Sequence, residues 1–153
     1  MKRNIAFFLV MALILIFAAC GGQAKTYDLA AVSQTMLDAL QDKEPLTLEP
    51  DAVTDMYALD PADVKSSACI VTMGGAFPDE IIMVEAVSAD AAKRVAKKLE
   101  ARLADVTNQA QNYDAESLAL FRKCKVETMG NYVNLFMSPD SENLRQIFTA
   151  AAK

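Results

Sequence analysis

Residues 123–138 read KCKVETMGNYVNLFMS, and this stretch decides the fold because it specifies one hairpin in two independent ways. Gly130-Asn131 is a signal for a two-residue turn between antiparallel strands. Such a turn pairs Met129 with Tyr132 and Val126 with Leu135. The pairing places most apolar side chains on one face, which consists of Cys124, Val126, Thr128, Val133, Leu135 and Met137. Since turn and apolar pattern agree in register, we predict strands over 123–129 and 132–138 with one buried face.

A second strand pair precedes this hairpin. Ser67–Met73 and Glu80–Val87 have strand character and flank a connection, 74–79, that contains glycine and proline. Ile81–Val84 is apolar at every position, which is typical of a strand buried on both faces. We therefore predict that this strand lies in the centre of the sheet.

Helical patterns surround and separate the two strand pairs. Apolar spacing and capping residues predict helices over 28–41, 51–57 and 89–111, after Asp114, and from Ser138 onward. The main elements follow the order α-β-β-α-β-β-α. This order predicts an α+β fold: a single domain with an antiparallel four-stranded sheet and helices packed on one face.

The first twenty residues have the pattern of a lipoprotein leader. Met1-Lys2-Arg3 is basic, and Ile5–Ala19 is an apolar run without a charge. At 1.5 Å per residue the run spans about 22 Å, which is shorter than the roughly 30 Å hydrocarbon core of a bilayer. Phe17-Ala18-Ala19-Cys20 resembles the bacterial lipobox, in which a peptidase cuts before a lipid-modified cysteine. An ordinary signal peptide cut elsewhere and an uncleaved anchor are the alternatives.

This leader predicts a division of the chain into three regions and a cellular location. Residues 1–19 form a lipoprotein signal peptide, 20–27 the lipidated cysteine with a short tether, and 28–153 one domain. We expect the domain to be extracytoplasmic. Lipid on Cys20 would hold it on the outer face of the cytoplasmic membrane, because two acyl chains give stable anchoring.

The composition excludes several classes of function. Loss of Lys2 and Arg3 with the leader takes the net charge from −5 to −7, which disfavours nucleic acid as a partner. The chain has no histidine, which excludes Ser–His and Cys–His catalysis and histidine-containing zinc sites. With Cys20 acylated, two cysteines remain, too few for a thiolate metal cage. We predict no catalytic residue, no metal site and no cofactor.

Several stretches of the mature chain, taken in order, resemble one family. They are Tyr57-Ala58-Leu59-Asp60-Pro61, Asp79-Glu80-Ile81-Ile82-Met83-Val84-Glu85-Ala86, Asp90-Ala91, Arg102, Asn112-Tyr113, Gly130-Asn131-Tyr132-Val133 and Ser138-Pro139-Asp140. In order and spacing they resemble small Gram-positive, clostridial-type surface lipoproteins with the domain of unknown function numbered 4358. The resemblance implies a cell-surface lipoprotein and brings no assigned activity or site.

Cys69 and Cys124 both fall on predicted strands. Outside the cytoplasm they could form a disulfide. A disulfide requires Cα atoms within about 7 Å, and hence the first and third predicted strands as neighbours. Two small buried thiols are the alternative interpretation.

Acidic residues are dense between 51 and 80. A calcium site is one interpretation, but the spacing matches no EF-hand loop, and Asp60 and Asp63 are suited to helix capping. A carboxylate-based hydrolase would use the same group, with Asp79 and Glu80 as its acidic pair.

A basic cluster on the long helix is read either as a solvated face or as a contact with lipid headgroups or anionic wall polymer, and it consists of Lys93, Arg94, Lys97 and Lys98.

Met129, Tyr132 and Phe136 lie on the other face of the predicted hairpin. Left uncovered, they would form an exposed apolar patch, and such patches often mark a partner surface. A helix packed over that face would explain these residues equally well.

The function that we expect is a membrane-anchored extracytoplasmic lipoprotein whose domain is a non-catalytic binding or interaction module. Its expected partners are membrane lipid, through acylated Cys20, and a membrane-proximal protein or a cell-wall component. One alternative is a small-ligand receptor accessory to a transporter, although such receptors resemble clamps far longer than the 134 residues that follow the leader. The other is a carboxylate-based cell-wall hydrolase.

Overall fold

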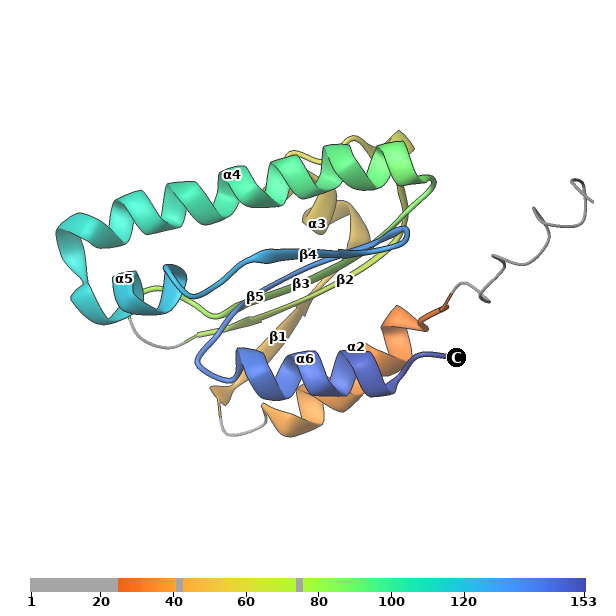
Figure 1. The fold of residues 1–153 in the computed structure, drawn as a ribbon. Helices are drawn as coiled ribbons and strands as arrows, with labels where there is room; N and C mark the ends of the chain where they lie inside the picture. Colours follow the sequence, from red (N-terminus) through yellow and green to blue (C-terminus); the bar gives the residue numbers. More distant parts are fainter. Residues whose placement is uncertain (1–24, 41–42, 74–75) are drawn as a thin grey trace, which may run out of the picture.

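The computed structural model describes residues 25–40, 43–73 and 76–153, so Cys20 with its leader and Gly74-Gly75 lie outside the described residues (Figure 1). The described chain forms five α-helices, one short 3-10 helix and one antiparallel sheet of five strands. The helices are α2 (Leu29–Ala39), α3 (Pro50–Met56), η2 (Pro61–Asp63), α4 (Ala89–Tyr113), α5 (Ala115–Phe121) and α6 (Ser141–Ala150). The strands are β1 (Pro45–Leu48), β2 (Val64–Thr72), β3 (Glu80–Ala86), β4 (Val126–Met129) and β5 (Tyr132–Met137), in the spatial order β1-β2-β3-β5-β4.

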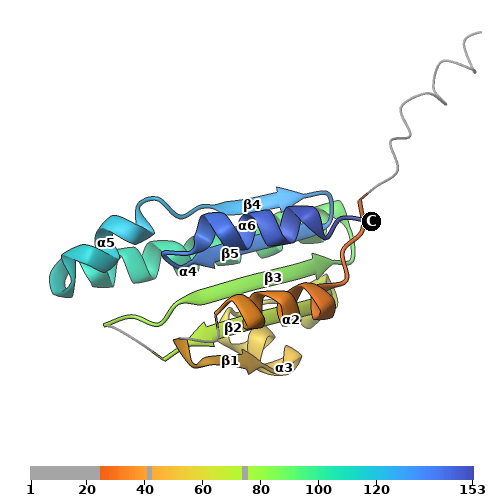
Figure 2. The same ribbon diagram turned by 90° about the horizontal axis from the view of Figure 1, so that it is seen from below.

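Helices cover both faces of the sheet, so the prediction of helices on one face is wrong. α3, α4 and α5 lie on one face, and α2 and α6 lie on the other (Figures 1 and 2). Ile82 and Val84 pack in the core beneath α4, whereas Ile81 and Met83 pack in the core beneath α2 and α6. A strand that is apolar on both faces needs a layer against each face, and β3 has both.

The sheet has five strands and not four, because Pro45–Leu48 pairs with β2 as an edge strand. Leu48 is the Cα partner of Cys69, and Leu46 is the partner of Val71. An edge strand tolerates Pro45, since a residue that lacks an N–H group need not interrupt a ladder there. β3 lies in the centre of the sheet, as its apolar sequence predicts.

The β4–β5 hairpin has the register that its turn predicts. Val126 pairs with Leu135 and Met129 pairs with Tyr132. Gly130 has a φ of 62°, a left-handed conformation that glycine adopts without strain. Strand β4 begins at Val126, so Cys124 precedes it rather than lying in it.

The helix boundaries follow their caps. The side chains of Asp28 and Ser88 accept hydrogen bonds from main-chain N–H groups at the starts of α2 and α4, at 3.2 and 3.1 Å. The sequence predicts Ser138 as the cap and Pro139 as the first residue of the last helix, whereas α6 begins at Ser141 with Asp140 as its N-cap, two residues later. Ser138 is buried, and its hydroxyl donates to Asp79 at 2.8 Å and accepts from the main-chain N–H of Asp140 at 3.2 Å.

Among residues 25–40, 43–73 and 76–153, no helix has both the length and the apolar character needed to cross a membrane.

The two ends of the described chain lie side by side. The main-chain N–H of Thr26 donates to the carbonyl of Lys153 at 3.3 Å, and the N–H of Lys153 donates back to the carbonyl of Thr26 at 3.0 Å. Tyr27 is 6% exposed, and its ring stacks on Phe148 with centroids 4.2 Å apart. Its main-chain N–H donates to the hydroxyl of Tyr132 at 3.2 Å. The chain therefore enters the domain at a fixed point beside the start of β5.

Candidate functional site

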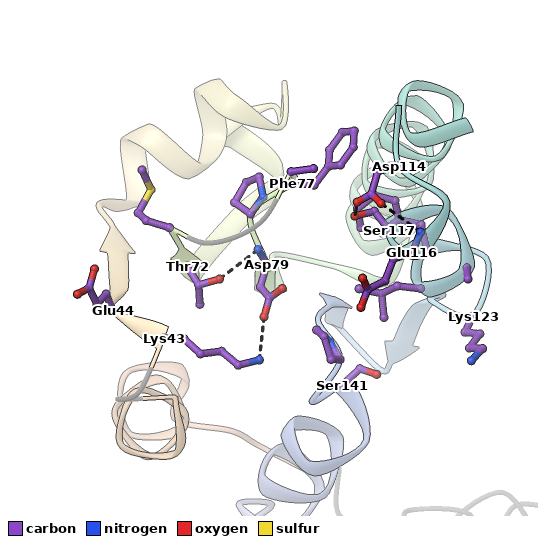
Figure 3. A pocket seen from close by; sticks show the side chains of 17 residues that line it. Lys43, Glu44, Thr72, Phe77, Asp79, Asp114, Glu116, Ser117, Lys123 and Ser141 are labelled. Atoms are coloured by element: carbon purple, nitrogen blue, oxygen red, sulfur yellow. Dashed lines mark hydrogen bonds and ion pairs between the residues drawn. The ribbon is translucent and has the colours of Figure 1, made fainter. Parts of the chain in front are cut away.

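A groove of about 900 Å³ opens at the end of the sheet where β2 connects to β3 (Figure 3). Its walls come from four separated parts of the chain: residues 43–44, residues 72–73 with 76–79, α5 with its flanks, and the start of α6. The residues that matter most for its chemistry are Lys43, Glu44, Phe77, Asp79, Glu116 and Phe121. Asp79 was singled out from the sequence. The others were missed, since no local pattern joins them.

One wall of the groove is organised around the carboxylate of Asp79 (Figure 3). Lys43 Nζ lies 3.4 Å from Asp79 Oδ2 and 2.5 Å from Asp140 Oδ2. The hydroxyl of Ser138 donates to the same oxygen of Asp79, and the main-chain N–H of Asp79 donates to Thr72 Oγ1 at 3.2 Å. Burial alone would lower the pKa of Lys43, but contacts with Asp140 and Asp79 outweigh it and raise that pKa. Asp79 thus ties the β2–β3 connection to the start of α6.

The opposite wall is α5 with its flanking residues. Asp114 ends α4 and also caps α5, where its carboxylate accepts hydrogen bonds from the Ser117 hydroxyl and, at 3.1 Å, from the main-chain N–H of Glu116. The bond from Ser117 is the main reason that the pKa of Asp114 is lowered. Phe121 is buried and meets Phe77 edge to face, with ring centroids 5.6 Å apart. This wall is therefore apolar at its base and anionic at its rim.

A buried polar network lies on the α4 side of the sheet, beginning at the residue after Asp79. The carboxylate of Glu80, which is 3% exposed, accepts two hydrogen bonds from Arg102 and one from the hydroxyl of Tyr57 at 3.0 Å. Tyr57 Oη also lies 3.5 Å from Cys69 Sγ. Burial raises the pKa of Tyr57, with a further contribution from Cys69 and Glu80. These contacts join α3, β2, β3 and α4 behind the groove.

The acidic residues between 51 and 80 do not converge on one point. Asp79 and Glu80 are neighbours in sequence, but one carboxylate is held beside the start of α6 and the other beneath α4. Asp63 accepts a hydrogen bond from Arg94 Nε at 2.8 Å, and this contact lowers its pKa. Among the residues that the structure describes, no three cysteine or acidic side chains are grouped so as to hold a metal ion.

The comparison with protein families identifies the domain. A family model with the description "Domain of unknown function (DUF4358)" matches residues 38–138. The chain belongs to this family. The DUF4358 match covers 101 of the 153 residues and includes the whole sheet, whereas α6 lies beyond its end. No curated protein and no solved structure matched the chain.

Three residues on which the family resemblance rests meet in the buried network of the DUF4358 domain. They are Tyr57, Glu80 and Arg102. Glu80 is 3% exposed, and its carboxylate accepts three hydrogen bonds, two from Arg102 and one from Tyr57. We therefore assign these residues to holding the domain together behind the groove.

Cys69 and Cys124 are free thiols in the DUF4358 domain, so the disulfide interpretation does not hold. β2 and β4 are not neighbours, because β3 and β5 lie between them. Cys69 is buried, and burial raises the pKa of its thiol to about 12. The thiol of Cys124 donates to the carbonyl of Leu120 at 3.4 Å.

The expected partner surface of Met129, Tyr132 and Phe136 is not formed. Tyr132 and Phe136 are each 5% exposed, and Met129 packs against the same cluster beneath α2 and α6. The aromatic ring of Tyr27 meets Tyr132 edge to face at 4.9 Å. This face of the DUF4358 hairpin is covered because α2 and α6 form a second helical layer, which agrees with the alternative interpretation of these residues.

Proposed function

We propose that the chain is a membrane-anchored extracytoplasmic lipoprotein and that its DUF4358 domain is a non-catalytic binding module. The leader that ends at Cys20 supports the anchor. The observation that carries the binding function is the groove. Its apolar base, formed by Phe77 and Phe121, and its charged rim combine the two features by which proteins orient small ligands or short segments.

The position of the groove supports a partner located away from the anchor. The chain enters the domain at Tyr27, beside Tyr132 at the start of β5. The other end of that strand is Met137, five residues and roughly 17 Å from Tyr132, and the groove lies beyond Met137. In both views of the fold, the C-terminus and α5 lie at opposite ends (Figures 1 and 2). An anchor on Cys20 would therefore leave the groove on the far side of the domain from its point of attachment.

The carboxylates of the groove support binding rather than hydrolysis. A carboxylate-based glycosidase needs two carboxyl groups that face one another across the scissile bond. Asp79 and Glu80 do not face one another. Each is neutralised by a basic side chain, Lys43 and Arg102 respectively. Asp114 is occupied in capping α5.

The anchor is tested by metabolic labelling of cells with an alkyne fatty acid. The wild-type chain should take up the label and remain with membranes, and a Cys20→Ala variant should do neither. Label on the Cys20→Ala variant would contradict lipid attachment at that residue.

The groove is tested by filling it. Ala119 is an exposed groove residue on α5, so Ala119→Trp should obstruct the groove. Ala104→Trp places the same side chain on an exposed part of α4 and is the matched control. In surface cross-linking on whole cells, one partner should be captured by the wild type and by Ala104→Trp and lost in Ala119→Trp. Equal capture by all three would show that the groove is not the binding surface.

A second candidate function is that of a small-ligand receptor accessory to a transporter. The groove volume of about 900 Å³ favours it, because sites for small molecules commonly span about 300–1,000 Å³. A ligand present at 100 times its dissociation constant stabilises the folded protein by about 2.7 kcal/mol. A thermal shift with one metabolite, absent in Ala119→Trp, would support the receptor over a macromolecular partner.

A further inference from the structure

The groove carries more negative than positive side chains. The carboxylates of Glu44, Asp79, Asp114 and Glu116 line it, against the amines of Lys43 and Lys123. The ammonium group of Lys43 is already held between Asp79 and Asp140. The other charged side chains are Glu44, Asp114 and Glu116 against Lys123, so the rim that a ligand meets is net anionic and favours a cation.

The anionic character is concentrated on the α5 wall. Glu116 is exposed and extends from α5 toward the hollow (Figure 3). Asp114 stands two residues earlier on the same wall, and its hydrogen bonds from Ser117 and the main chain keep it ionised. A basic group placed against this wall would meet the carboxylate of Glu116, with the negative charge of the capping residue Asp114 on the same wall.

An apolar surface adjoins the anionic wall. Phe77 and Phe121 meet edge to face at the base of the groove. Met73, which also lines it, is 69% exposed and is among the most exposed large apolar side chains of the described chain. Exposed apolar side chains beside a cavity gain when a ligand removes them from water, at roughly 25 cal/mol for each Å² buried.

We infer that the groove binds a short peptide segment that presents a basic side chain next to an apolar one. The basic group would face Glu116 and Asp114, and the apolar group would cover Phe77 and Met73. A free amine could engage the α5 wall but would leave the apolar base and most of the roughly 900 Å³ unfilled. This inference rests on the proposed binding function and names the chemistry of the partner.

The test uses the full chain in discs of neutral phosphatidylcholine, with empty discs as the blank. The probe is a six-residue peptide of alternating lysine and leucine, titrated by calorimetry. It is compared with one peptide that carries glutamate for lysine, one that carries serine for leucine, and free lysine. We expect the lysine–leucine peptide to bind at least about tenfold more tightly than any of the three.

A matched pair of charge reversals assigns the binding to the groove. Glu116→Lys should weaken the lysine–leucine peptide roughly tenfold, because the change replaces an attraction by a repulsion. Glu100→Lys, at an exposed position of α4 outside the groove, should leave its affinity unchanged. Unchanged binding by Glu116→Lys would overturn the inference.

Three further outcomes would also overturn it without deciding against the proposed function. Tighter binding of the glutamate–leucine peptide, lost in Ala119→Trp, would keep the groove as a binding site and reject the cationic class. Binding of free lysine as tight as that of the peptide, again lost in Ala119→Trp, would reject a peptide in favour of a small cation. Binding of no probe would reject the inference, and the surface cross-linking experiment would still decide on the groove.

Discussion

Arg102 donates hydrogen bonds from two nitrogens, Nε and Nη2, to the carboxylate of Glu80, a residue that is 3% exposed. The guanidinium itself keeps 32% of its side-chain surface exposed. In this ion pair the anion is therefore buried and the cation is partly exposed to solvent, so mutation of one residue should not have the same effect as mutation of the other. Removal of Arg102 leaves the charge of Glu80 buried without a counter-ion, whereas removal of Glu80 leaves a guanidinium that water can reach.

Arg102→Ala should lower the free energy of unfolding by on the order of 3 kcal/mol, because it leaves Glu80 buried without its counter-ion. Glu80→Gln combined with Arg102→Met should recover much of this loss, since the buried charge of Glu80 is removed and the amide can still accept from Tyr57. Urea denaturation of the three proteins measures the effect. A double variant no more stable than Arg102→Ala would mean that lost packing, rather than the stranded charge, causes the loss.

Tyr27 should be a stability determinant although it lies close to the described N-terminus. Tyr27→Ala removes a ring that is 6% exposed and stacked on Phe148, so we expect a loss of about 3–5 kcal/mol. Tyr27→Phe should cost less than about 1 kcal/mol, because the hydroxyl makes only a 4.0 Å contact with Met129 Sδ. Thermal and urea unfolding provide the comparison. Equal losses in both variants would locate the contribution in the hydroxyl instead of the ring.

Acid should destabilise the domain partly through Glu127. Burial alone would raise the pKa of Glu127, but hydrogen bonds from Lys125 and Arg145 outweigh it and lower that pKa. A carboxyl group with a folded-state pKa below its unfolded value of about 4.3 stabilises the fold above that value. This stability is lost as the pH falls through the folded-state pKa.

The measurement is the free energy of unfolding in urea at several values between about pH 6 and pH 3. The wild type should lose stability over this range more steeply than Glu127→Gln, which has no carboxyl group to protonate there. Glu100→Gln, on the exposed face of α4, is the control and should follow the wild type. Parallel curves for the wild type and Glu127→Gln would show that protonation of Glu127 does not contribute to the loss of stability in acid.

The two cysteines of the domain should differ in reactivity. Burial raises the pKa of Cys69 to about 12 and also raises the pKa of Cys124, but Cys69 is fully buried and Cys124 is not. In a Cys20→Ala background near pH 8, a disulfide reagent should modify one thiol in the folded protein and the second only in denaturant. Cys124→Ser should abolish the faster reaction. Persistence of that reaction in Cys124→Ser would show that the region around Cys69 opens readily.

The parts of the fold that could be predicted have a strong local signal. Gly130-Asn131 specifies the turn of the β4–β5 hairpin, and the pairing of Val126 with Leu135 follows from it. Helix α4 was predicted with its cap at Ser88 because twenty-five residues give many repeats of the helical period. In each case the pattern and the structure depend on contacts that are close in sequence.

The errors concern elements whose placement depends on distant contacts. β1 is four residues long and begins with Pro45, so it offers too few alternations to be recognised. Its strand conformation comes from pairing with residues more than twenty positions later in the chain. The second helical layer was missed although the sequence held a sign of it: a strand as apolar as Ile81–Val84 requires cover on both faces.

The groove could not be predicted, because its residues are brought together only by the tertiary fold. Lys43 and Glu116 are separated by most of the sheet in sequence and face the same hollow in space. Ser138 illustrates the same limit. Its sequence context suits a helix cap, and its hydroxyl does accept from the main-chain N–H of Asp140, but the hydroxyl also donates to the distant Asp79 and the helix begins two residues later.

The reciprocal hydrogen bonds between Thr26 and Lys153 have a practical consequence for handling the protein. A fluorescent protein or affinity tag fused after Lys153 would emerge beside the point where the chain enters the domain. Such a fusion would sit at the end opposite to α5 and leave the mouth of the groove unobstructed. For the same reason, a protein immobilised on a surface through its C-terminus would have the groove facing the solution, where an analyte could reach it.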